Sequence, residues 1–211
     1  MLRSLRSVAF RKKTYTLARL AADVAALVRR AGDVAEVNAG MDPAFREQVM
    51  LAVARTNACR YCVFAHTDAG RHAGLTDADL ARLEGMDAAD FDRRTWTALA
   101  YARALAQADF GPVDGDLVAV VVEMHGEDGR RRIETAARLM TVANLTGNTV
   151  DAFLSRLRGD PAPGMHVLDE LAITAVWLAG AAVTTFNILR ARPQSPLALL
   201  GEFRAMDTAS G

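Results

Sequence analysis

The sequence predicts an all-α protein, and three observations support this class. Hydrophobic residues make up 51% of the 211 residues and aromatic residues only 6%, so alanine, leucine and valine dominate the apolar set. Such a composition, with few glycines and prolines, favours helices. Apolar residues recur at helical spacing through most of the chain. The valine-rich stretch at residues 116–124 could form a strand, but no partner strand is visible elsewhere in the sequence.

Capping and stop residues set the limits of the individual helices. Gly32 is expected to end the first amphipathic helix. Asp42, followed by Pro43, is expected to begin the next helix. Asn57 is the expected cap of the helix after that, and residues 76–79 resemble a capping box with Asp in place of Glu. The expected helices span residues 14–31, 43–56, 58–73, a short stretch after 76, 91–108, 116–124, 131–157 and 166–190. We expect a turn over residues 126–129, a proline-containing linker over 159–164 and disorder after Arg204.

The chain divides into an N-terminal helical extension over residues 1–40, a helical domain over 41–190 and a C-terminal tail over 191–211. The first thirteen residues hold five basic residues and no acidic one. No apolar run follows them, so we expect a basic, frayed N-terminus rather than a signal peptide. Residues 171–189 carry no charge. Their threonines and the lack of flanking aromatic residues favour a buried helix, in the core or in a subunit interface, over a membrane span.

Charge and cysteine content exclude several classes of protein. Twenty-five basic residues balance twenty-five acidic ones, so no strong global field attracts nucleic acid or an anionic membrane. The only two cysteines form one Cys-x-x-Cys motif, which rules out a disulfide framework. This usage fits the reducing cytoplasm, where such a lone pair is more often catalytic or metal-binding than structural. We therefore expect a cytoplasmic protein without nucleic-acid or membrane partners.

Four residues form the constellation that can carry chemistry. On a helix, Cys59, Cys62 and His66 share one face. A position in the first helical turn favours the thiolate of Cys59, and His66 is within reach of Cys62 as a proton acceptor. Glu47 lies on the preceding helix, and an antiparallel hairpin could return its carboxylate to His66 and fix the imidazole tautomer. These features are those of an activated thiol that forms and reopens a disulfide.

The pattern Glu-x11-Cys-x2-Cys-x3-His, followed by Gly74-Leu75-Thr76, resembles the AhpD-like group of the carboxymuconolactone decarboxylase family. The resemblance spans roughly residues 40–160. It implies an AhpD-like helical bundle that assembles into homo-oligomers, trimers or hexamers, and acts as a thiol-dependent peroxidase or disulfide reductase on hydroperoxides. Glu47, Cys59, Cys62 and His66 would then form the redox site with its proton relay. Cys62 would meet the peroxide, and Cys59 would resolve the product.

The resemblance also bears on partners and on alternatives. It implies no bound cofactor, and a dithiol reductant such as the lipoyl group of a protein partner, or a thioredoxin-like protein. One alternative is a carboxymuconolactone decarboxylase-type enzyme, although those members generally lack the cysteine pair. Another is a non-enzymatic redox-sensing or interaction protein. A structural zinc site is a third, but the motif supplies only three ligands within one short helix. Asn144 and Asn148 share a helix face and are expected to be buried polar contacts near the site.

Overall fold

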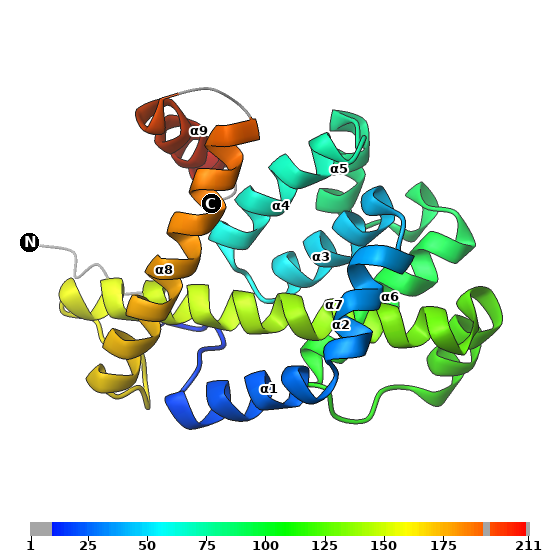
Figure 1. Cartoon of the computed structure of the whole chain (residues 1–211), viewed down its shortest axis with the longest axis horizontal. Coiled ribbons are helices and arrows are strands. Elements are labelled where there is room, and N and C mark those ends of the chain that lie inside the picture. The colour runs from blue at the N-terminus through cyan, green and yellow to red at the C-terminus, as the bar shows by residue number, and fades with distance from the viewer. Residues whose placement is uncertain (1–9, 192–194, 210–211) are drawn as a thin grey trace, which may run out of the picture.

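Helix boundaries follow the capping residues that separate the apolar stretches. A computed structural model describes residues 10–191 and 195–209, and this part of the chain contains helices and no strand, which confirms the all-α class (Figure 1). The elements are α1 (Leu17–Arg29), α2 (Ala31–Gly40), α3 (Pro43–Thr56), α4 (Arg60–His72), α5 (Asp77–Gly85), the short 3₁₀ helix η1 (Ala88–Asp90), α6 (Arg93–Gln107), α7 (Gly115–Leu157), α8 (Val167–Ala191) and α9 (Pro196–Ala209).

Side-chain caps explain several of these starts. The Asp42 carboxylate accepts a hydrogen bond from the Phe45 backbone N–H at 2.9 Å, with Pro43 in the first helical turn. Thr76 and Asp79 form a reciprocal capping box at the start of α5. Both starts were visible in the sequence, because a cap depends only on residues that are neighbours in the chain.

The long helix α7 runs through the whole molecule and packs against most other helices (Figure 1). It includes the valine-rich stretch, for which the helix prediction is confirmed. Its one break is Gly126, with φ 70° and ψ 170°, a conformation that a side chain would strain. The turn predicted over residues 126–129 is therefore wrong beyond Gly126, since helical geometry resumes at the next residue.

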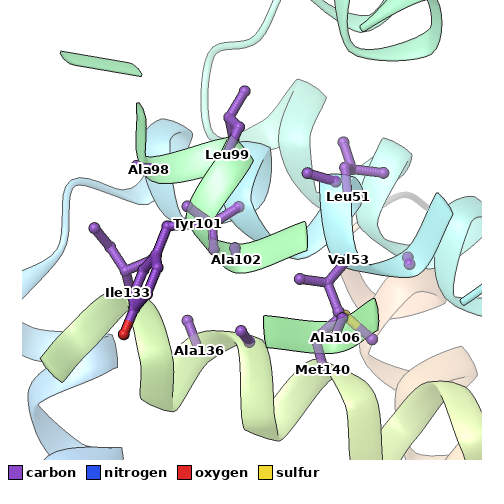
Figure 2. Packing of buried hydrophobic residues seen from close by; sticks show 14 of the residues in the cluster. Leu51, Val53, Ala98, Leu99, Tyr101, Ala102, Ala106, Ile133, Ala136 and Met140 are labelled. Atoms are coloured by element: carbon purple, nitrogen blue, oxygen red, sulfur yellow. The ribbon is translucent and has the colours of Figure 1, made fainter. Parts of the chain in front are cut away.

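The main hydrophobic core lies where α3, α6 and α7 meet (Figure 2). Ala98, Ala102 and Ala106 repeat every fourth position along α6 and are all fully buried. Such small side chains allow α6 to approach α7 closely. Leu51 and Val53 of α3 are likewise fully buried. This packing fixes the C-terminal end of α3, and with it the connection from α3 to α4.

A short N-terminal segment, residues 12–15, is bound along α7, and we call it the N-terminal strap. Lys12 Nζ lies 2.7 Å from Asp151 Oδ2, and the Tyr15 backbone N–H donates to Thr149 Oγ1 at 2.9 Å. Tyr15 itself is fully buried. The predicted frayed N-terminus is therefore wrong from residue 12 onward, because specific side chains of α7 hold the segment. Residues 1–9 lie outside the described residues.

Three further expectations need correction. The stop expected at Gly32 is wrong, since Gly32 lies inside the unpredicted helix α2. Disorder after Arg204 is also wrong, because α9 continues to Ala209. Helix α8 lies only partly in the core of the chain, since Ile173 is fully buried but Val176 is 59% and Leu178 56% exposed. The subunit interface expected for the exposed side chains stays a prediction. Among the described residues, no helix is long and apolar enough to cross a membrane.

Candidate active site

The two cysteines lie at the tight connection between α3 and α4. Asn57 ends α3, and Ala58 then adopts a left-handed conformation with φ 53°, which is uncommon for a residue other than glycine. Cys59 follows as the N-cap of α4, one position before the first turn in which it was expected. This turn brings Cys59 Sγ to 2.8 Å from Cys62 Sγ. The predicted proximity of the two sulfur atoms is therefore present.

The two thiols differ in exposure and in acidity. Cys59 is fully buried, whereas Cys62 retains 8% of its accessible surface. The hydrogen bond from the Cys62 thiol lowers the pKa of Cys59 against the opposing effect of burial, and the Cys62 backbone N–H lowers it further. The same thiol–thiol hydrogen bond, together with burial, raises the pKa of Cys62. Negative charge on the pair therefore resides preferentially on Cys59, while Cys62 is the less completely buried of the two residues.

Glu47 and His66 form a second pair, as expected from a helical hairpin. His66 Nδ1 lies 2.6 Å from Glu47 Oε2, and Arg46 Nε donates to the other carboxylate oxygen, Oε1, at 3.2 Å. Glu47 is only 4% exposed. Burial alone would raise the pKa of Glu47, but hydrogen bonds and charge from His66 and Arg46 outweigh it and lower the pKa. The carboxylate is therefore ionised and orients the imidazole.

The two pairs are linked through α4, which carries one member of each, Cys62 and His66. In the part of the chain that the structure describes, no hydrogen bond joins His66 to either cysteine. The expected direct reach from His66 to Cys62 is therefore absent from this conformation. Residues four apart on a helix have Cβ atoms about 5–6 Å apart, a gap that one water molecule can bridge.

A wall of small and polar residues on α7 faces the sulfur pair. A Cβ atom added at Gly147 would lie 2.9 Å from Cys59 Sγ, so the α7 backbone passes directly beside that sulfur. Asn144 and Asn148 are fully buried on the same face, which confirms them as buried polar residues. Asn148 Nδ2 donates to the Asn57 carbonyl at 2.7 Å and to the Lys13 carbonyl at 3.1 Å. This wall therefore ties the α3–α4 connection to the N-terminal strap.

Aromatic side chains from α8 and α9 cover Tyr61, which stands between the cysteines in the motif. The Trp177 ring of α8 lies 4.7 Å from the Tyr61 ring, and the Phe203 ring of α9 stacks on it at 5.6 Å between centroids. Phe64 contacts Phe203 edge-on at 5.3 Å. We call Tyr61, Phe64, Trp177 and Phe203 the aromatic cover. Sequence patterns could not indicate this cover, because helical periodicity does not show which distant helices meet.

Asp151 of α7 is the charged centre of the same region. Its carboxylate accepts hydrogen bonds from Arg60 Nη2 and from the Tyr61 hydroxyl, each at 2.8 Å. Burial, with the charge of Asp151, raises the pKa of Tyr61 to about 12, so this hydroxyl stays protonated and donates. Lys12 completes the cluster through its 2.7 Å ion pair. Asp151 therefore connects the N-terminal strap to the helix that carries the cysteines.

One cavity of the structure is not lined by the cysteines. It measures about 710 Å³ and lies between α4 and α9, with Phe64, Asp68 and Glu202 among its lining residues. Neither cysteine nor His66 lines it. In the described part of the chain, no cluster of three or more His, Cys, Asp or Glu side chains could hold a metal ion. The alternative of a structural zinc site therefore gains no support.

Part of the chain, including the four candidate site residues, is similar to a known protein family. Residues 22–106 match the sequence model of the carboxymuconolactone decarboxylase family. The matched segment begins within the N-terminal part expected to be an extension and contains Glu47, Cys59, Cys62 and His66. No curated protein and no solved structure matches the chain. The similarity to the carboxymuconolactone decarboxylase family therefore covers the α3–α4 hairpin and ends before α7, which supplies the asparagine wall.

Proposed function

We propose that the protein is an AhpD-like thiol peroxidase and disulfide reductase of the carboxymuconolactone decarboxylase family. The observation that carries the proposal is the pair of buried sulfur atoms 2.8 Å apart at the N-terminus of α4, beside the Glu47–His66 pair. Two thiols in this position can exchange two electrons with a substrate and close a disulfide. The family match and the resemblance of the four-residue pattern support the same activity.

The first step is the attack of the Cys62 thiolate on a peroxide oxygen. His66, oriented by Glu47, accepts the Cys62 proton through one water molecule. The sulfur electron pair then forms a sulfur–oxygen bond as the oxygen–oxygen bond breaks. The leaving alkoxide or hydroxide takes up a proton, which gives an alcohol or water and the sulfenic acid of Cys62. The 8% exposure of Cys62 favours small hydroperoxides, because a bulky substrate cannot approach so deeply buried a residue.

The second step closes the disulfide. The Cys59 thiolate, which the lowered pKa favours, attacks the Cys62 sulfur and displaces hydroxide, which leaves as water after protonation. The two thiols have then supplied the two electrons that reduce the peroxide. The difference in burial between the two cysteines suits this order, because the fully buried resolving thiol needs to meet only its neighbour.

Reduction of the disulfide uses an external dithiol such as a lipoyl group or a thioredoxin-like protein. Its thiolate attacks the sulfur of Cys62, the less deeply buried of the two cysteines, and Cys59 leaves as the thiolate. A leaving thiol with a lowered pKa departs faster, so the site also favours reopening. No cofactor bound to the chain is needed for either half of the cycle.

The proposal extends to assembly, since exposed apolar side chains on α8 support a homo-oligomer. Leu171, Val176, Leu178 and Phe186 are each at least 46% exposed in the single chain. A charged residue in place of Leu178 is expected to lower the molar mass measured by light scattering to that of a smaller species. An unchanged mass would remove this support for an α8 interface.

The test of the activity is peroxide consumption by purified protein with dihydrolipoamide as reductant. Cys62→Ser is expected to abolish turnover. With dihydrolipoamide left out, Cys59→Ser is expected to consume one equivalent of peroxide and to stop at the sulfenic acid, which a dimedone probe would label. Full turnover in both variants would refute the proposal. A disulfide that forms once with peroxide and is not recycled by any dithiol would instead favour the redox sensor.

A further inference from the structure

Three buried asparagines next to the sulfur pair each have one polar atom without a hydrogen-bond partner among the described residues. These atoms are Asn57 Oδ1, Asn144 Nδ2 and Asn148 Oδ1. Asn144 and Asn148 are fully buried, and Asn57 is 4% exposed. Buried polar atoms in folded proteins are nearly always paired, and an exception calls for a functional or structural reason. Two of these atoms are amide oxygens, which accept, and Asn144 Nδ2 is the one donor of the three, so it is the atom that suits a negatively charged sulfur.

The orientation of Asn144 follows from its one hydrogen bond. Its Oδ1 accepts from Asn57 Nδ2 at 3.1 Å, and Asn57 Nδ2 also donates to Thr141 Oγ1 at 3.3 Å. The carbonyl end of Asn144 is thereby held toward the end of α3. Its amide nitrogen occupies the opposite end of the same planar group and is free to donate.

The sulfur pair lies within reach of that amide nitrogen. Gly147, one turn further along α7, passes directly beside Cys59 Sγ, so this face of the helix borders both cysteines. Burial and the bond to Cys59 raise the pKa of Cys62, and the side chain of Asn144 acts in the opposite direction on that thiol. In the resting thiol pair, however, the amide makes no hydrogen bond of standard geometry. A neutral thiol is a weak acceptor, whereas a thiolate is a strong one.

We propose that Asn144 is a catalytic residue that donates its side-chain N–H to the Cys62 sulfur whenever that sulfur carries negative charge. The inference rests on the proposed function, because it assigns the attacking thiolate to Cys62. A donor fixed in a buried site stabilises a developing charge without rearrangement, and it is more effective there than in water. The bond would form in the thiolate before attack, and again when Cys62 leaves or is attacked during disulfide exchange.

The test measures the ionisation of Cys62 directly. In a Cys59→Ser background only one thiol titrates, so the pH dependence of its alkylation by iodoacetamide reports the Cys62 thiolate. Asn144→Leu keeps a similar volume and removes the donor. We expect the alkylation midpoint to rise by about one pH unit, which corresponds to ~10-fold slower alkylation near neutral pH. Thr141→Val is the matched control, because it removes the other partner of Asn57 on the same helix, and we expect an unchanged midpoint.

The outcomes separate this inference from the proposed function. An unchanged midpoint in a folded Asn144→Leu protein would overturn the role of Asn144, whatever the wild-type activity. An equal rise with Thr141→Val would also overturn it, because the effect would then belong to the packing of Asn57. If Asn144→Leu fails to fold, the nearly isosteric Asn144→Asp replaces it. Its carboxylate should raise the midpoint further, and a lowered or unchanged midpoint would contradict the proposal. A shifted midpoint in a protein without peroxide turnover would refute the peroxidase alone.

Discussion

Gly147 offers the sharpest test of how α7 holds the redox pair. A Cβ atom at this position would lie 2.9 Å from Cys59 Sγ, 3.3 Å from Tyr61 Cδ2 and 3.4 Å from Trp177 Nε1. Favourable contacts between such heavy atoms lie at about 3.5–4 Å, so Gly147→Ala overlaps the sulfur by roughly 0.6–1 Å. Cys59 has a short side chain on a constrained backbone, with left-handed Ala58 before it. The sulfur can therefore yield only by leaving its partner, Cys62.

Two effects of opposite sign set the size of the change. Overpacking a core position costs about 1–3 kcal/mol in the free energy of unfolding. Replacing glycine by alanine inside a helix raises the free energy of unfolding by about 0.5–1 kcal/mol. Gly147→Ala should thus destabilise the protein by roughly 0.5–2 kcal/mol. Gly32→Ala is the matched control, because a Cβ at Gly32 meets nothing within 4 Å, and at this position in the first turn of α2 it should change the stability little.

Urea unfolding of the reduced proteins measures the difference between the two variants. The rate of Cys59 alkylation by iodoacetamide gives an independent measure, because a displaced sulfur becomes more accessible. Faster alkylation and lower stability in Gly147→Ala, with neither change in Gly32→Ala, is the expected result. If Gly147→Ala is as stable as Gly32→Ala and its thiols react like those of the wild type, the close approach of α7 to Cys59 is refuted.

Three other substitutions probe the surroundings of the sulfur pair. Glu47→Gln should lower the free energy of unfolding at pH 7 by about 1–2 kcal/mol, through the loss of charge-assisted hydrogen bonds. The folded-state pKa of Glu47 is lowered, so the wild type has this stability in full above the unfolded carboxyl pKa of about 4.3. It loses the stability as the pH falls through the folded-state pKa. The stability of the variant, measured by urea unfolding, should therefore depend less on pH in the acid range. Asp151→Asn should speed alkylation of Cys59 at neutral pH, because the charge of Asp151 raises the pKa of that thiol. Phe203→Ala should speed alkylation of Cys62 by roughly 3- to 10-fold, on the order of 1 kcal/mol, by opening the aromatic cover.

Each of these expectations has a contradicting result. An acid unfolding profile of Glu47→Gln that superimposes on the wild type would show that the carboxylate is not held by His66. Slower alkylation in Asp151→Asn would reverse the assigned electrostatic effect. For Phe203→Ala, the control is Phe186→Ala, whose side chain is 64% exposed. Equal rates in these two variants would mean that the aromatic cover does not restrict access to Cys62.

Local features of the site were predictable from the sequence, and distant ones were not. The sulfur pair and the Glu47–His66 contact arise within one helical hairpin, so helical geometry suffices to bring them together. Asn57 and Asn144 meet across 87 positions, and helical periodicity carries no information about such a meeting. The failure to predict helix α2 has a different cause. Gly32 is a strong stop signal, but as the second residue of a helix it costs little, because the first turn lacks hydrogen-bonded amides in any case.

The order in which the chain is made gives the aromatic cover a consequence for biosynthesis. Cys59 and Cys62 are translated well before Asp151 and before Phe203, which lies 142 positions after Tyr61 (203 − 61). At about 5–20 residues per second, the nascent chain carries both thiols uncovered for roughly 7–28 s. During this interval the ribosome-bound chain is open to oxidants and to mixed disulfides with small thiols. The finished fold thus buries a thiol pair that its own synthesis leaves uncovered until α9 is made.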